Sequence, residues 1–262
     1  MDAVVTAGSR PLPNDPLYEA TRGGYKALLD IAGKPMIQWV LDALSACPQV
    51  ERVTVVGLPP YTNLFCDHPL TILEDQGGLL INTRTGVLEL LQHNPALSHA
   101  LLISSDIPAL TPQMLQWAIG TMLETDHDFL YPVITRQVME ARYPGSRRTY
   151  LHLKDIEVCG ADVICIRSEV AAEANDLWSK IIDSRKNPIK QAALLGFDTL
   201  FMILLRQYSL EQASEAIGKR LGLRARGVLC PYAEMGMDVD KPHQLALITS
   251  DLAQSGLKAA AA

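Results

Sequence analysis

Residues 3–26 read AVVTAGSRPLPNDPLYEATRGGYK, and this stretch is the starting point for predicting the fold and the site. Its apolar start, Ala3–Val5, predicts a short buried strand that ends at Ala7-Gly8. The chain then runs through Ser9 and a loop containing proline, asparagine and glycine before it reaches Lys26. Small residues let backbone N–H groups approach an anion closely, and a lysine at the end of the loop can reach the same anion. The stretch favours a triphosphate-binding loop. The structural alternative is an ordinary glycine turn followed by a solvated lysine.

The composition narrows the class of protein. The 262 residues suffice for one large α/β domain or two small ones, and 48% hydrophobic residues can bury a sizeable core. The formal net charge of −6 argues against a general nucleic-acid or anionic-membrane binder. The five cysteines are scattered without C-x-x-C spacing, so we expect neither a zinc site nor a disulfide framework. We expect a cytoplasmic protein with no signal peptide and no membrane span.

The first half of the chain alternates predicted strands and helices. Apolar side chains recur at helical spacing over residues 36–44, and residues 51–57 read ERVTVVG, which is typical of a strand. Residues 70–82 and 99–122 repeat the pattern. We therefore predict a Rossmann-like α/β fold, a three-layer sandwich whose mostly parallel central sheet carries helices on both faces. A nucleobase could lie against the pair Gly77-Gly78, although that segment alone favours a simple strand-to-helix turn.

Acidic residues stand at two informative positions. Asp106 lies where the apolar strand HALLIS emerges, and ligands of parallel sheets bind at the carboxyl ends of strands. Mg²⁺ typically takes one or two protein carboxylates together with substrate phosphates. Near the end of the chain, Asp238 and Asp240 flank Val239, so an extended backbone would place both side chains on one face. They could supply a second carboxylate for the metal. The alternatives are a turn or cap role for Asp106 and an N-cap role for Asp240.

The middle of the chain is less regular. Residues 150–153 and 158–166 predict further strands, a small β insertion, and residues 171–221 form a mostly helical block by pattern. A basic group of Arg147, Arg148 and Lys154 either reaches a phosphorylated acceptor or is a solvated loop. The helical block lines the acceptor site, covers the sheet or forms a homodimer interface, and the pattern does not choose among these.

Taken together, five segments resemble the MobA-like nucleotidyltransferases over nearly the whole chain. They are AVVTAG at Ala3–Gly8, KALLDIAGKPMIQWVLDAL at Lys26–Leu44, Gly77-Gly78, SSDIPALT at Ser104–Thr111 and MDVDKPHQL at Met237–Leu245. Two motifs depart from the family pattern. The phosphate loop, usually Gly-Gly-x-Gly-x-Arg, is Ala7-Gly8-Ser9-Arg10-Pro11 here, and the acceptor-side Gly-Gly-Asn corresponds to Cys159–Asp162.

The resemblance implies a set of site residues. In such enzymes the glycine loop and its lysine hold the triphosphate, which implies Ala7, Gly8, Ser9 and Lys26 here. The base and ribose would border Asp75, Gly77 and Gly78, while Asp106 with Asp240 or Asp238 would hold Mg²⁺, with Mn²⁺ as the alternative metal. It also implies one domain in three parts: an NTP-binding core (1–134), an acceptor or lid insertion (135–225) and a closing segment with the Asp pair (226–262).

The implied reaction is nucleotidyl transfer from an NTP. A phosphorylated small-molecule acceptor, such as a sugar phosphate or pterin phosphate, would attack the α-phosphorus and pyrophosphate would leave, with Lys26 and Asp106 as the catalytic residues. Two alternatives are a metal-dependent glycosyltransferase that uses the D-x-D pair and a non-catalytic nucleotide-binding protein. The base, the acceptor and the oligomeric state stay open at this stage.

Overall fold

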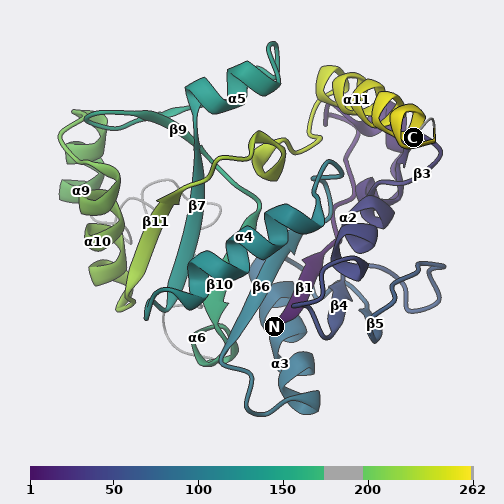
Figure 1. Ribbon diagram of the computed structural model, residues 1–262, viewed down its shortest axis with the longest axis horizontal. Helices are drawn as coiled ribbons and strands as arrows, with labels where there is room; N and C mark the ends of the chain where they lie inside the picture. The colour runs from purple at the N-terminus through teal and green to yellow at the C-terminus, as the bar shows by residue number, and fades with distance from the viewer. Residues whose placement is uncertain (174–196, 261–262) are drawn as a thin grey trace.

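A single large sheet forms the centre of the molecule (Figure 1). The computed structural model describes residues 1–173 and 197–260. Within these residues, nine strands join in the order β5-β4-β1-β6-β10-β7-β9-β8, and β11 pairs with β7. The strands are β1 (Asp2–Thr6), β4 (Val53–Val56), β5 (Leu70–Leu73), β6 (His99–Ser104), β7 (Phe129–Thr135), β8 (Leu151–His152), β9 (Glu157–Gly160), β10 (Val163–Arg167) and β11 (Ala225–Leu229). A separate two-stranded sheet joins β2 (Asp30–Ile31) and β3 (Lys34–Pro35).

The predicted mostly parallel sheet is confirmed. Strands β5, β4, β1 and β6 run parallel to one another, and β11 is parallel to β7. Strand β10 is antiparallel to both β6 and β7, so it joins two sets of strands that point the same way. The β8–β9 hairpin extends the sheet from β7 and is the small β insertion that the pattern predicted.

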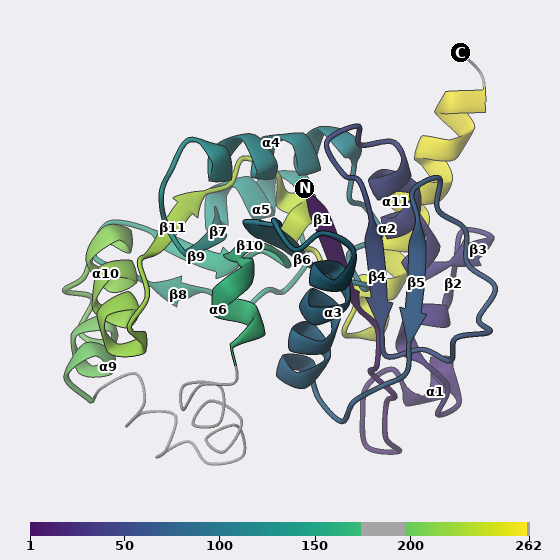
Figure 2. The same cartoon turned by 90° about the horizontal axis from the view of Figure 1, so that it is seen from below.

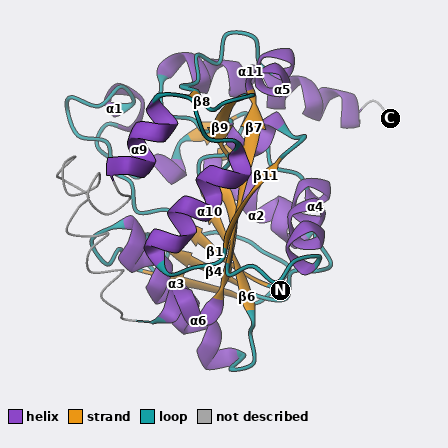
Figure 3. Ribbon diagram, turned by 90° about the vertical axis from the view of Figure 1, so that its left-hand side faces the viewer, coloured by secondary structure: helices purple, strands orange, loops and turns teal. Residues whose placement is uncertain are grey.

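Helices cover both faces of the sheet because successive strand residues point to opposite sides (Figure 3). Helices α2 (Met36–Ser45), α4 (Pro112–Leu123) and α11 (Pro242–Ala260) share one core with Ala3 and Val5. Helices α3 (Leu79–His93) and α6 (Ser168–Ala172) pack with Val4 on the other face, away from α4 in Figure 2. Helices α9 (Phe197–Leu204) and α10 (Leu210–Leu221) contribute to a third core beside Val133.

Short elements complete the described chain: α1 (Tyr18–Thr21), η1 (Lys26–Leu28), α5 (Arg136–Arg142) and η2 (Ala233–Gly236). Among the described residues, no helix combines the length and apolar character that a bilayer crossing requires. Much of the predicted helical block over 171–221 lies outside the described residues, which contain α6, α9 and α10 there.

Helix α2 begins at Met36, where the helical spacing predicted it, directly after Lys34 and Pro35 pair with β2. One local prediction differs from the structure. The apolar run 158–166, predicted as one strand, is interrupted at Ala161-Asp162. The interruption has a physical cause, because the two halves of the run have different neighbours. Strand β9 pairs with β7, whereas β10 lies between β7 and β6 and pairs with both. At the break, the Asp162 N–H donates to the Met235 carbonyl (2.7 Å).

The topology creates a ligand position at one edge of the sheet. Strands β4 and β5 lie on one side of β1, while β6 lies on the other, so the direction in which strands are added reverses between β1 and β6. Open α/β sheets bind ligands in the crevice outside the carboxyl ends of the strands at such a reversal. Here those ends lead into Ala7-Gly8 and Ser105-Asp106, and the Ser105 N–H donates to the Thr6 carbonyl (3.1 Å).

Candidate functional site

The loop after β1 depends on a glycine. A Cβ atom built on Gly8 would lie 2.6 Å from the Asp75 Oδ1, so a larger residue would displace the loop that follows β5. The Ala7 N–H donates to the Val56 carbonyl (2.8 Å), which fixes the start of the loop. The other end is fixed where the Lys26 N–H donates to the Ser9 carbonyl (2.9 Å). The two ends of the long loop from Ser9 to Lys26 therefore lie side by side.

Lys26 reaches two of the predicted acidic residues. Its Nζ lies 2.6 Å from the Asp106 Oδ2 and also contacts the Asp240 Oδ1, with only 9% of the lysine side chain exposed. Burial lowers the pKa of Lys26, but Asp106 and Asp240 more than offset this effect and hold the pKa above its ordinary value. The lysine is therefore a buried cation between two carboxylates. We call Lys26, Asp106 and Asp240 the lysine cluster.

Hydrogen bonds from neighbouring segments position the two carboxylates. The Ser104 hydroxyl donates to the Asp106 Oδ1. The Val239 N–H donates to the Asp106 carbonyl (3.0 Å), which ties the chain after η2 to the end of β6. The buried Gln244 on α11 accepts from the Asp240 N–H through its Oε1 (3.0 Å). Residues far apart in sequence thus converge at the carboxyl ends of β1 and β6.

Asp238 and Asp240 take different partners, although an extended chain would put both on one face. Asp238 pairs with Arg148, and only 15% and 16% of these two side chains are exposed. Asp240 pairs with Lys26 and keeps 54% of its side chain exposed. The structure thus brings Asp240, and not Asp238, to the lysine that Asp106 contacts.

The lysine cluster suits a divalent cation in its ligand chemistry. Its two carboxylates converge on one point, where both contact the same ammonium group, and carboxylate oxygens are the ligands that Mg²⁺ and Mn²⁺ prefer. The described residues contain no group of three or more His, Cys, Asp or Glu side chains arranged to hold a metal. Two protein carboxylates with substrate phosphates would be enough for Mg²⁺.

The loop after β5 carries the other predicted nucleotide residues. The Asn82 Nδ2 donates to the Asp75 Oδ1 (2.7 Å), and the Gln76 N–H donates to the Asn82 Oδ1 (2.8 Å). Gly77 adopts φ +93°, which favours glycine, and Gly78 leads into α3. The structure therefore places Asp75, Gly77 and Gly78 in one ordered loop whose Asp75 contacts the position of Gly8.

Three polar residues of this region were not assigned a role from the sequence. Ser104 supports Asp106, and Asn82 holds the Asp75 loop, although an asparagine among the apolar residues of α3 is a weak signal. Asp162 was noted only within the altered acceptor-side motif. Its Oδ2 is buried and accepts no hydrogen bond within the described part of the chain. Burial, followed by the charge of Asp106, raises the pKa of Asp162 to about 7.

Comparisons with known proteins show the family of the chain. The family described as the MobA-like NTP transferase domain matches residues 19–191. A probable molybdenum cofactor guanylyltransferase from Thermococcus kodakarensis is 23% identical over 132 residues. That match covers 49% of this chain and 63% of the relative, so the chain spans less than two thirds of that protein's length.

Two solved structures extend the likeness to the whole sheet. A structure titled as a hypothetical transferase from Thermus thermophilus is 31% identical, with a TM-score of 0.78, over 93% of this chain and 98% of the other. A CMP:2-keto-3-deoxy-manno-octonic acid synthetase solved with CTP is 14% identical, with a TM-score of 0.59, over 97% and 98% of the two chains. The second likeness shows the fold alone.

Proposed function

From the premise that this chain belongs to the MobA-like NTP transferase domain family, we propose that it is a nucleotidyltransferase that moves a nucleoside monophosphate from an NTP to a phosphorylated acceptor. One observation carries the proposal: Lys26 contacts both Asp106 and Asp240 beside the glycine loop, at the carboxyl ends of β1 and β6. A cation and two carboxylates at the reversal point of an α/β sheet suit a metal–triphosphate substrate.

The chain's own groups would act by position and charge. Backbone N–H groups of the Gly8 loop would face the phosphates, and Lys26 would neutralise charge that grows on the α-phosphate and the leaving pyrophosphate. A phosphate nucleophile is already ionised, so this reaction needs no general base on the protein. Asp106 and Asp240 would hold Mg²⁺, which would supply further neutralisation of the phosphate charge.

Two neighbouring segments would select the substrates. The loop from Asp75 to Gly78 adjoins the Gly8 position and would border the base and ribose. Asp162 and Arg148 would face the acceptor, because both lie close to the lysine cluster. The Ser104 N–H donates to the Asp162 carbonyl (3.0 Å) while the Ser104 hydroxyl donates to Asp106, and Arg148 pairs with Asp238. The matched relatives are named for GTP and CTP chemistry, so these two nucleotides are the first to test.

A thermal-shift titration with ATP, GTP, CTP and UTP, each with and without Mg²⁺, tests the binding half of this proposal. A ligand that binds only the folded state raises the Tm, by an amount equivalent to about 2.7 kcal/mol at a concentration of 100 times Kd. We expect one nucleotide to give a clear shift that depends on Mg²⁺. Pyrophosphate release with a panel of sugar and alcohol phosphates then tests turnover.

The variant Asp106→Asn should lose the Mg²⁺-dependent part of the shift, while Asp126→Asn, with 83% of its side chain exposed before β7, should keep it. Binding without pyrophosphate release across the panel would favour a non-catalytic nucleotide-binding protein. Release of sugar from a nucleotide sugar without pyrophosphate would favour a glycosyltransferase. An unchanged Mg²⁺ response in Asp106→Asn would refute the metal assignment.

A further inference from the structure

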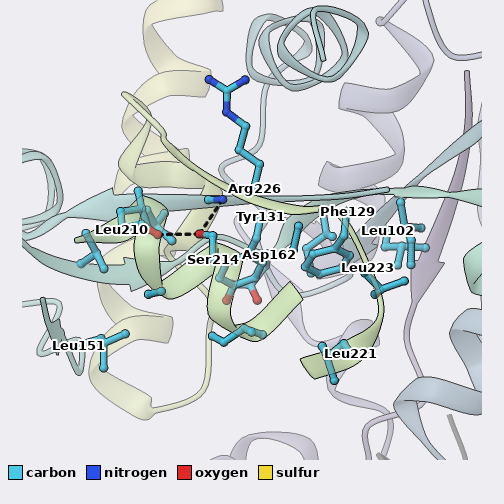
Figure 4. Close-up of a pocket in the computed structure, with 18 of the residues that line it drawn as sticks. Leu102, Phe129, Tyr131, Leu151, Asp162, Leu210, Ser214, Leu221, Leu223 and Arg226 are labelled. Carbon is cyan, nitrogen blue, oxygen red and sulfur yellow. Dashed lines mark hydrogen bonds between the residues drawn. The ribbon is translucent and has the colours of Figure 1, made fainter. Parts of the chain in front are cut away.

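An apolar cavity lies on the sheet face opposite α4 and is lined by residues of α3, α9 and α10. Figure 4 shows side chains that line it. It measures about 460 Å³, within the range of about 300–1,000 Å³ that is common for small-molecule sites. Its floor is formed by β6, β7 and β10, which contribute Leu102, Tyr131, Val133 and Ile164. The described residues thus enclose enough space beside the proposed site for a small molecule.

The walls of the cavity offer a ligand mostly hydrocarbon. Leucine, isoleucine and alanine side chains of α9 and α10 face it, including Ile203, Leu210 and Ala213. Its Ser214 is already satisfied, because its hydroxyl donates to the Leu210 carbonyl (2.7 Å) and accepts from the Gly227 N–H (3.0 Å). The side chain of Arg226 points away from the cavity in Figure 4. This part of the cavity would therefore select its ligand by apolar contact.

One end of the cavity lies one hydrogen bond away from the lysine cluster. Its lining includes Thr6 at the end of β1 and Ser104 at the end of β6, the residue whose hydroxyl donates to Asp106. Asp162 also lines it, and the Ser104 N–H donates to the Asp162 carbonyl (3.0 Å). One end of the cavity thus lies beside the carboxyl ends of β1 and β6, where the transfer reaction is proposed.

Asp162 adds a polar requirement at that end. Its Oδ2 is buried without a hydrogen-bond partner in the described residues, and a buried unsatisfied acceptor is costly. A hydroxyl group on a bound molecule would satisfy it. A ligand without such a donor would leave it unpaired and bind more weakly.

We infer that the acceptor has an apolar body that lies in this cavity, with its phosphate at the Asp106 end and a hydroxyl beside the phosphate that donates to Asp162. The substrate class is a phosphorylated, hydroxylated hydrocarbon, in contrast to a fully polar sugar phosphate. This inference rests on the proposed function for the identity of the molecule as the acceptor. The cavity's affinity for an apolar body can be measured without turnover.

Calorimetric binding of butyl, hexyl and octyl phosphate to the whole protein tests the apolar part. Each methylene that enters an apolar site contributes about 0.8 kcal/mol, so affinity should rise about fourfold per methylene at a stoichiometry of one. Leu151→Asn should flatten this series, because Leu151 lines the cavity and is 50% exposed, so the variant should still fold. Leu229→Asn is the matched control: Leu229 is 53% exposed on β11 and is not part of the lining.

A comparison of octyl phosphate with 2-hydroxyoctyl phosphate tests the role of Asp162. The hydroxylated compound should bind about tenfold more tightly to the natural protein, and Asp162→Leu should abolish that preference. An affinity that does not depend on chain length would overturn the apolar site, and this is also the result expected if another part of the chain fills the cavity. Equal effects of Leu151→Asn and Leu229→Asn would overturn it as well. If the natural protein bound the alkyl phosphates with affinity that rises with chain length but bound none of the four nucleotides, the proposed function alone would be refuted.

Discussion

Two groups of charged side chains lie at opposite edges of the same sheet. The lysine cluster stands at the carboxyl ends of β1 and β6 and holds one cation against two carboxylates. The second group, which we call the arginine cluster, joins Asp126 and Asp128 before β7 to Arg167 at the end of β10 and to Arg224 before β11. The two clusters have similar residue types and different charge balances.

Within the arginine cluster, each arginine pairs with both aspartates. Arg167 reaches Asp128 at 2.8 Å and Asp126 at 3.0 Å, while Arg224 reaches the same two carboxylates at 2.9 and 2.7 Å. Two cations thus meet two anions, and they join three strand ends. The lysine cluster keeps one negative charge in excess. The two carboxylates that share one lysine would gain from a further cation. In the arginine cluster, by contrast, the charges of the described residues balance. This difference in charge balance separates the candidate site from the structural cluster.

The largest effect should follow from removing the shared lysine. Lys26→Met leaves Asp106 and Asp240 without their cation and removes charge neutralisation from the reacting phosphates. We expect turnover, measured by pyrophosphate release, to fall about 10²–10³-fold, as it does when one preorganised electrostatic group is lost. Lys34→Met is the control, because Lys34 pairs with Asp42 on the surface of α2. A Lys26→Met rate within threefold of the natural rate would contradict a catalytic lysine.

The neighbouring aspartates provide the next test, because only one belongs to the lysine cluster. Asp238→Asn leaves the largely buried Arg148 without its carboxylate, which should destabilise the fold by about 3 kcal/mol and lower the Tm by about 6–12 °C. Asp240→Asn should leave the Tm nearly unchanged and raise the Mg²⁺ concentration needed for half-maximal activity. Scanning calorimetry and a Mg²⁺ titration measure both quantities. If Asp238→Asn changed only the Mg²⁺ dependence, the two assignments would have to be exchanged.

The smallest effect concerns the arginine cluster and should appear only in stability. Hydrogen bonds from Arg224 and Arg167 hold the pKa of Asp128 well below its ordinary value, against the effect of burial. Such a group stabilises the fold fully above its unfolded pKa of about 4, and the contribution disappears as the pH falls towards the folded pKa.

Asp128→Asn should therefore cost about 1–3 kcal/mol at pH 7 and progressively less below about pH 4, with unchanged nucleotide binding. Urea unfolding of both proteins from pH 3 to pH 7 measures this difference. A stability difference that stays constant down to pH 3 would contradict a lowered pKa of Asp128 in the folded protein. A loss of nucleotide binding would show that the arginine cluster and the lysine cluster are not independent.

The parts of the fold that depend on local pattern could be predicted from the sequence. The apolar runs that end at Gly8 and Asp106 predicted two strands of a mostly parallel sheet, and the structure pairs them in parallel. The reversal of strand order between them was not predicted, because the alternation of strands and helices does not fix which strands become neighbours. The family resemblance implied that Lys26 and Asp106 serve one metal–triphosphate substrate, and the structure brings the two side chains into contact.

The rest depends on contacts between distant segments. An extended chain places Asp238 and Asp240 on one face, but Arg148 and Lys26 draw them to different partners. The apolar run 158–166 gives no sign of the interruption at Asp162, which follows from pairing with two different strands. The cavity could not be predicted at all, because its lining comes from strands and helices spread between β1 and β11.

The hydrogen bond from the Lys26 N–H to the Ser9 carbonyl has an evolutionary consequence. Because this bond holds Lys26 beside Ser9, the position of Lys26 does not depend on the conformation or length of residues 10–25. The entropy of closing a loop grows only slowly with its length, by about 0.6 kcal/mol per doubling. Relatives can therefore gain or lose residues between these anchors while Lys26 keeps its place beside Gly8. A spacing-based motif search would miss such relatives, but a search for the two anchor positions in three dimensions would find them.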